Sequence, residues 1–105
     1  MAQRRMMQEV PKADVIITNP THVAVALKYE QGKKDAPVVL AKGYDEVAQK
    51  IKAIAAEHGI PMVENVPLAR ALAREAQVGQ AIKAKRFKQV AEILAAVCRL
   101  RRGAA

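Results

Sequence analysis

The stretch that decides the fold is VIITNPTHVAV, residues 15–25. Both of its ends are rich in Val, Ile and Thr, which are residue types typical of β-strands. Between the ends stand Asn19, Pro20, Thr21 and His22, with no glycine. Proline cannot donate a hydrogen bond to a sheet, and a hairpin more often turns on Asn-Gly or Asp-Gly. The sequence therefore predicts two neighbouring strands joined by an unusual tight connection.

The rest of the chain predicts two further strands and at least three helices. Alternating apolar residues extend the second strand to Tyr29, a polar loop follows, and helical spacing of apolar residues recurs in the C-terminal half. Gly59 is the expected end of the first long helix, and Asn65 is a candidate cap for the next one. The expected elements are a strand at 38–43, a helix at 44–58, a strand at 60–65, a helix from Pro67, and a helix at 84–100. Cys98 is on the apolar side of this last helix, and we expect it to be a core residue.

This order predicts an α/β fold, a small mixed sheet of about four strands surrounded by three or four helices in a single domain. The strand-helix-strand unit from Val38 to Asn65 should form a right-handed parallel crossover. Residues 1–12 are polar and basic, and we interpret them as a tail or a helix that belongs to a preceding segment. The predicted domain is 13–105.

Composition limits the classes of function. A chain of 105 residues is large enough for one core without staples, and its single cysteine excludes an intramolecular disulfide. No apolar run approaches the length of a membrane span, and residues 1–12 lack the apolar region of a signal peptide. With only two histidines and no cluster of ligands, the sequence predicts no metal and no cofactor. We expect a soluble domain from a reducing compartment.

The net charge of +8 suits nucleic acid, anionic lipid or an acidic partner, and it does not choose among them. Only three residues are aromatic and none is tryptophan, which disfavours a stacking surface for single-stranded nucleic acid. A small basic nucleic-acid-binding α/β domain remains the alternative function.

The Asn-Pro pair has an unusual chemistry. In most Asn-X sequences the backbone nitrogen of X can attack the Asn side chain, which gives deamidation and leaves the chain intact. This route is closed here because the nitrogen of Pro20 carries no hydrogen. The remaining intramolecular route is attack by the Asn19 side-chain nitrogen on its own carbonyl carbon. This reaction breaks the chain before Pro20 and leaves a succinimide at Asn19.

Local features favour this reaction, although a plain turn is the commoner use of Asn-Pro. Proline pushes Asn19 out of the helical region, and His22 can transfer a proton because its ordinary pKa lies near neutral pH. A single cleavage within about an hour needs a barrier of only about 22 kcal/mol. The expected activity is therefore a single-turnover self-cleavage and not that of a multiple-turnover enzyme.

The segments NPTHVAVALKY, APVVLAKG, IAAEHGIPMVENVPLARAL, VGQAI and VAEILAAV resemble, in this order and spacing, one known family. They are similar to the cytoplasmic C-terminal domain of the export-switch proteins of type III secretion, the FlhB/YscU family. The resemblance covers about residues 13–100, and AVALKY looks more like the flagellar members.

The resemblance implies autocleavage between Asn19 and Pro20, with Thr21 and His22 completing the motif. The two fragments are expected to stay associated, and the cleavage to accompany a change in exported substrates. Residues 1–12 would be the end of a linker from a membrane-embedded part, with the domain on the cytoplasmic face of the bacterial inner membrane. The implied partners are other export-gate components, export substrates and a length-control protein, with no nucleic acid.

The resemblance also implies a shallow apolar pocket that holds export substrates. By matching motifs, this pocket falls on Ala36, Pro37, Ala91 and Leu94. Ordinary packing between a loop and a helix is the alternative interpretation of these four residues.

Overall fold

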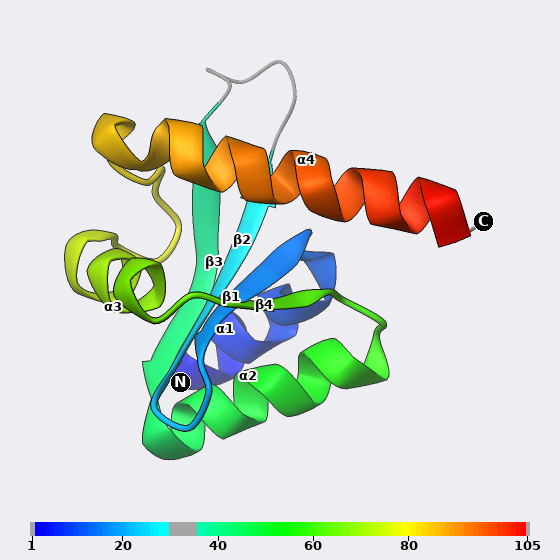
Figure 1. The fold of residues 1–105 in the computed structure, drawn as a ribbon. Helices are drawn as coiled ribbons and strands as arrows, with labels where there is room; N and C mark the ends of the chain where they lie inside the picture. Colours follow the sequence, from blue (N-terminus) through cyan, green and yellow to red (C-terminus); the bar gives the residue numbers. More distant parts are fainter. Residues whose placement is uncertain (1, 30–35, 105) are drawn as a thin grey trace.

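The computed structural model describes residues 2–29 and 36–104 and shows a sheet between two layers of helices (Figure 1). The polar loop at 30–35 lies outside the described residues. In chain order the elements are α1 (Ala2–Glu9), the 3-10 helix η1 (Val10–Lys12), β1 (Val15–Asn19), β2 (Val23–Tyr29), β3 (Pro37–Tyr44), α2 (Asp45–Glu57), β4 (Met62–Glu64), α3 (Val66–Glu75), the 3-10 helix η2 (Ala84–Arg86) and α4 (Phe87–Ala104).

The sheet has four strands in the order β3-β2-β1-β4. β1 pairs antiparallel with β2 from Val15↔Leu27 to Asn19↔Val23, and β1 pairs parallel with β4. β3 is antiparallel to β2, so β3 and β4 run in the same direction at opposite edges of the sheet. The predicted mixed sheet is confirmed, and β1 has a hydrogen-bonded neighbour on each side.

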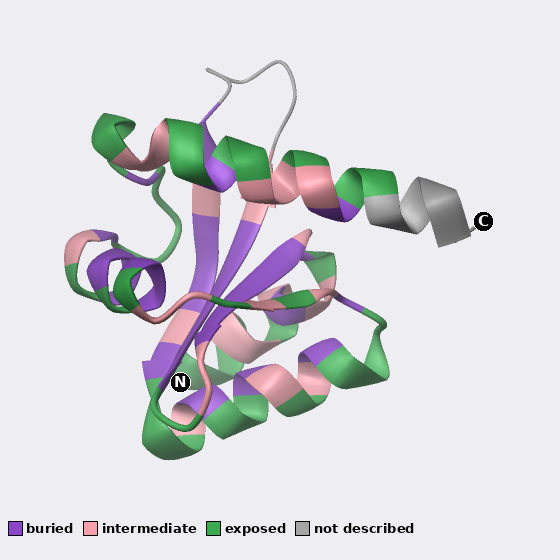
Figure 2. Cartoon of the chain, viewed as in Figure 1, coloured by how far each residue is buried: buried purple, intermediate pink, exposed green. Residues whose placement is uncertain are grey.

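Side-chain alternation gives the sheet two buried faces (Figure 2). On one face, large residues of the central strands pack against α3 and α4. On the other face, small residues such as Ala24 and Ala26 let α2 approach the backbone closely. The large-residue face of the sheet includes Val15, Ile17, Val25, Leu27 and Val39, and the helices pack Leu68, Leu72 and Val90 against it.

Glycine and asparagine fix the ends of the helices. Gly59 follows α2 with φ +66, a conformation that glycine adopts at little cost. The Asn65 side chain accepts a hydrogen bond from the Leu68 N–H at 3.2 Å, which confirms the predicted cap of α3. A Cβ added at Gly43 would lie 2.2 Å from Cγ1 of Val47, so glycine lets β3 lead directly into α2. β3 itself continues one residue past Gly43, to Tyr44.

The N-terminal segment packs on the small-residue face. Val10 is fully buried there, and Met6 and Met7 pack against the same cluster. This segment is therefore in contact with the sheet domain. That it ends a linker from a membrane-embedded part stays a prediction.

The prediction that Cys98 lies in the core is wrong, because Cys98 is exposed. The core-facing stripe of α4 passes instead through Val90 and Val97. The apolar stripe in the sequence is wider than the buried face, and periodicity alone does not locate its edge.

Candidate functional site

Asn19 is the last residue of β1, and His22 directly precedes β2. The His22 N–H donates to the Asn19 carbonyl oxygen at 2.9 Å, which closes a four-residue turn. Pro20 stands in the turn and not in a strand, so its missing N–H costs the sheet no hydrogen bond. The carbonyl that accepts this bond belongs to the Asn19–Pro20 peptide.

The Asn19 side chain is on the same face of the sheet as Val15 and Ile17, because alternate residues of a strand share a face. α3 packs on that face. Asn19 is half-buried and lines an open hollow at this end of the sheet. The other residues that line the hollow are His22, Val23, Tyr44, Arg70 and Arg74.

Asp45, in the first turn of α2, contacts His22 at the end of the turn that leads into β2. The Asp45 N–H donates to the His22 carbonyl oxygen at 2.9 Å, and Asp45 Oδ1 lies 3.5 Å from Nδ1 of His22. Both side chains are exposed, at 66% for His22 and 77% for Asp45. Asp45 has φ +47, a left-handed conformation that Asp tolerates better than most residues. Asp45 therefore meets His22 through backbone and side chain.

A lysine from α2 contacts the middle of the turn. Lys52 Nζ donates to the Pro20 carbonyl oxygen. The pair Val23↔Tyr44 explains how α2 reaches this place, since it sets the end of β3 beside the start of β2. Sequence reasoning identified neither Asp45 nor Lys52, because both reach the turn through the pairing of distant segments.

The four residues predicted for the cleavage are together in this turn. Asn19 and Pro20 are half-buried, whereas Thr21 and His22 are exposed. Asn19 and His22 line the same hollow, and Thr21 is not among the residues that line it.

A second hollow of about 320 Å³ lies at the opposite end of the sheet, between α4 and the ends of β2 and β3. Figure 1 shows α4 crossing the sheet at this end. Three of the four residues predicted for substrate binding line it, namely Pro37, Ala91 and Leu94. Ala36 is only 7% exposed and does not line the hollow. Its remaining lining is mostly apolar and comprises Tyr29, Phe87, Ala95 and Cys98. Cys98 thus lies on the same side of α4 as Ala91 and Leu94, as helical spacing predicts, but it lines the hollow there and is exposed.

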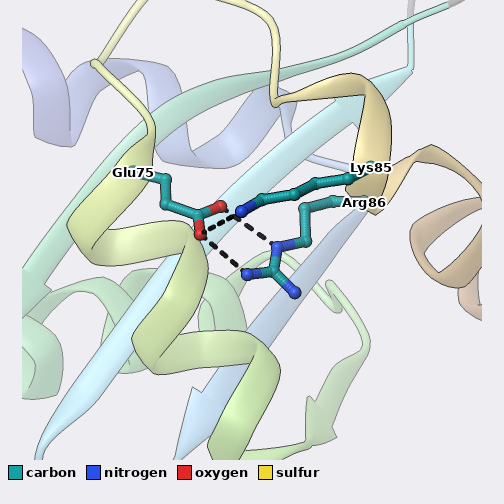
Figure 3. Close-up of polar contacts among 3 residues, drawn as sticks. All are labelled: Glu75, Lys85 and Arg86. Atoms are coloured by element: carbon teal, nitrogen blue, oxygen red, sulfur yellow. Dashed lines mark hydrogen bonds and ion pairs between the residues drawn. The ribbon is translucent and has the colours of Figure 1, made fainter.

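A cluster of three charges connects α3 to η2, the 3-10 helix that directly precedes α4 (Figure 3). Glu75 Oε1 accepts from Arg86 Nε at 3.0 Å, and Glu75 Oε2 accepts from Arg86 Nη2 at 2.7 Å. Lys85 Nζ lies 3.5 Å from the same carboxylate. The hydrogen bonds from Arg86, more than the nearby positive charges, lower the pKa of Glu75 from 4.5 to about 2. The cluster fixes α3 relative to α4, and these helices carry residues of the first and second hollows respectively.

Within the described ranges no group of three His, Cys, Asp or Glu side chains is placed to hold a metal ion. Nor do these ranges contain a helix that is long and apolar enough to cross a bilayer.

Comparison with known proteins gives consistent matches. A profile of the FlhB HrpN YscU SpaS family matches residues 1–97. The flagellar biosynthetic protein FlhB of Bacillus subtilis is 63% identical over 97 residues, 92% of this chain, and that of Salmonella typhimurium is 55% identical over 101 residues, 96% of this chain. The chain spans only 27% and 26% of these two relatives.

Solved structures of proteins from the same family are also similar to this chain. The crystal structure of the cytoplasmic domain of FlhB from Shewanella putrefaciens has a TM-score of 0.90 at 49% identity, covering 95% of this chain and 77% of that one. A mutated EscU C-terminal domain has a TM-score of 0.83 at 34% identity, covering 88% and 92%. The chain belongs to the FlhB, HrpN, YscU and SpaS family of export apparatus proteins.

Proposed function

We propose that this chain is a self-cleaving export-switch domain that cuts its own backbone between Asn19 and Pro20 and thereby changes which substrates are exported. One observation carries the proposal. The Asn19 carbonyl, which the reaction must attack, is hydrogen-bonded by the His22 N–H inside a turn whose two sides are anchored in a sheet.

The reaction balances without a second substrate. The Asn19 Nδ2 forms a bond to its own carbonyl carbon, the carbon–nitrogen bond to Pro20 breaks, and a proton moves from Nδ2 to the Pro20 nitrogen. Water then opens the succinimide. In the addition step negative charge grows on the Asn19 carbonyl oxygen. The His22 N–H, 2.9 Å from that oxygen, stabilises this charge as an oxyanion-hole donor does.

The His22 ring is the proton carrier in this proposal. Nδ1 faces the Asp45 carboxylate at 3.5 Å, which orients the ring and assigns the proton transfer to Nε2. Asp45 acts through His22 and is a positioning residue. Lys52 is a second positioning residue, because its ammonium group holds the Pro20 carbonyl.

The fragments are expected to remain together after cleavage. Residues 1–19 include β1, which lies inside the sheet between β2 and β4. Val10, Val15, Ile16 and Ile17 in this fragment are fully buried. Each such side chain contributes about 1.5–3 kcal/mol, and the ladders on both sides of β1 add to that.

The second hollow is proposed as the place where export substrates dock. Its apolar lining, with Pro37, Ala91 and Leu94, suits apolar side chains of a peptide. Ala36 then acts only by supporting Pro37, since it is buried. In the proposed setting, residues 1–12 lead from a membrane-embedded part, and the domain meets other gate components and a length-control protein at the cytoplasmic face of the inner membrane.

The proposal is tested by replacing the nucleophile. Asn19→Ala removes the side-chain amide, and Asn19→Asp keeps the shape but lacks the nitrogen. Wild-type protein incubated at neutral pH should give two chains on a denaturing gel, and both variants should stay intact. A variant of Asn19 that splits at the same bond as quickly as wild type would exclude the mechanism.

The alternative of a nucleic-acid-binding domain rests on net charge alone and stays a prediction. It requires binding to duplex DNA or RNA that weakens steeply as salt rises. We place it second because the family match covers residues 1–97, which is most of the chain.

A further inference from the structure

We propose that Arg70 and Arg74 bind the carboxylate that cleavage creates at Asn19, and so hold the new chain end against α3. The inference rests on the proposed self-cleavage. It assigns a role to two cations that the cleavage reaction itself does not use.

The two arginines and Asn19 line one hollow. Arg70 and Arg74 are one helical turn apart on the exposed side of α3, and both are exposed. Neither makes an ion pair with another residue in the described parts of the chain. The carboxylate of Asp45, at the start of α2, lies 3.5 Å from Nδ1 of His22. The hollow therefore presents two cations to Asn19 and has no anion of its own in its lining.

α3 is held firmly enough to keep the arginines in place. Leu68 and Leu72, on its opposite side, are at most 2% exposed. Lys42 Nζ donates to the carbonyl oxygens of Ala73 and Ala76 at 2.8 and 2.7 Å, which fixes the end of the helix on β3. The side of α3 that bears the arginines is thus set by its packing.

The chemistry of the product supplies the missing anion. Ring opening of the succinimide consumes one water and produces one carboxylate, whichever ring carbonyl the water attacks. One outcome is a terminal Asn carboxylate, and the other is a carboxylate on the former side chain with an amide at the terminus. In both cases the charge is on residue 19. The guanidinium fork of arginine binds such a carboxylate with two hydrogen bonds.

The test compares how fast the N-terminal fragment leaves the cleaved domain. Wild type and Arg70→Gln/Arg74→Gln are expressed as the full chain, allowed to cleave, and placed in dilute denaturant, with release of residues 1–19 followed by size-exclusion chromatography. We expect equal cleavage on a denaturing gel and release at least about threefold faster in the arginine variant, with the difference shrinking at high salt.

Two controls make the result specific. Lys88→Gln/Arg99→Gln removes two exposed cations from α4 and should release the fragment at the wild-type rate. In the uncleaved Asn19→Ala background, Arg70→Gln/Arg74→Gln should leave the thermal midpoint unchanged, because no new carboxylate exists there.

The outcomes separate the two proposals. Normal cleavage with equal release rates in wild type and the arginine variant overturns the carboxylate site and leaves the self-cleavage intact. Slower cleavage with an unchanged release rate would mean that the arginines assist the cleavage reaction. It would also overturn the proposal that they bind the new carboxylate. A wild-type chain that stays intact removes the self-cleavage and this inference together, and the gel shows this before any release is measured.

Discussion

β1 has two parts that differ sharply although they are adjacent in sequence. Its interior, Val15–Thr18, is buried on both faces and is bonded to strands on both sides. Its end, Asn19, is half-buried and leads into a turn held by backbone hydrogen bonds and by contacts from α2. The interior stabilises the fold, whereas the end is the site of the proposed cleavage.

This difference explains how a chain can be cut without losing its fold. The bond between Asn19 and Pro20 lies one step beyond the last pair of the β1–β2 ladder, Asn19↔Val23. The proposed cleavage breaks this bond, and we expect that ladder and both faces of the sheet to stay in place. Substitutions in the two parts should therefore change different measurements.

The largest effect on stability is expected inside the strand. Ile17 is fully buried on the large-residue face, and Ile17→Ala should lower the free energy of unfolding by about 2–5 kcal/mol through lost burial and a cavity. Thr21→Ala in the turn should change it by less than about 0.5 kcal/mol, because Thr21 is exposed. Urea denaturation of both variants in an Asn19→Ala background measures this difference. Similar losses of unfolding free energy in the two variants would contradict the distinction between the interior of β1 and its end.

The next effect is on the rate of cleavage. His22→Ala removes the ring but keeps the backbone N–H that binds the Asn19 carbonyl. Cleavage should slow by about 10²-fold or more, and the fold should be unaffected. Gel time courses at several pH values check this. If the variant cleaves at the wild-type rate, the ring is not the proton carrier and His22 contributes only through its backbone N–H.

A smaller effect is expected from the lysine on α2. Lys52→Met keeps much of the side-chain volume and removes the donor to the Pro20 carbonyl oxygen, so cleavage should slow by about three- to tenfold. Lys50→Met, an exposed lysine in the same helix, is the matched control. Equal rates for the two variants would exclude a positioning role for Lys52.

The smallest effect concerns Glu75, the last residue of α3. Its pKa is lower in the folded chain, about 2, than its ordinary 4.5, so the unfolded chain binds a proton first as the pH falls. The contribution to stability is present above pH 4.5 and is lost toward pH 2. Thermal midpoints of wild type should converge with those of Glu75→Gln across this range, whereas Glu92→Gln on α4 should not show that convergence. A difference in thermal midpoint between wild type and Glu75→Gln that does not change with pH would contradict this prediction.

The sequence predicts those features that depend on neighbours along the chain. The strands around Asn19, the cap at Asn65 and the stop at Gly59 follow from local propensity and turn chemistry. The proposed cleavage between Asn19 and Pro20 also rests on local chemistry, the missing hydrogen on Pro20, and it stays a prediction. These features could be predicted because each depends on only a few adjacent residues.

Other features arise from packing between distant segments. Asp45 and Lys52 reach the turn only because β3 pairs with β2, and Arg70 reaches the hollow only because α3 crosses the face that Asn19 shares. The exposure of Cys98 depends on how α4 is rotated about its own axis where it packs on the sheet. A pattern along one chain does not contain these alignments, so the sequence predicts which bond would break but not the groups around it.

The most direct test of the self-cleavage is a time course of intact mass on the freshly purified wild-type chain. We predict two fragments that meet between Asn19 and Pro20. Their summed mass should first equal that of the intact chain, as the succinimide requires, and then rise by one water as the ring opens. A single chain with an unchanged mass after prolonged incubation at neutral pH, or fragments that meet at another bond, would contradict the account.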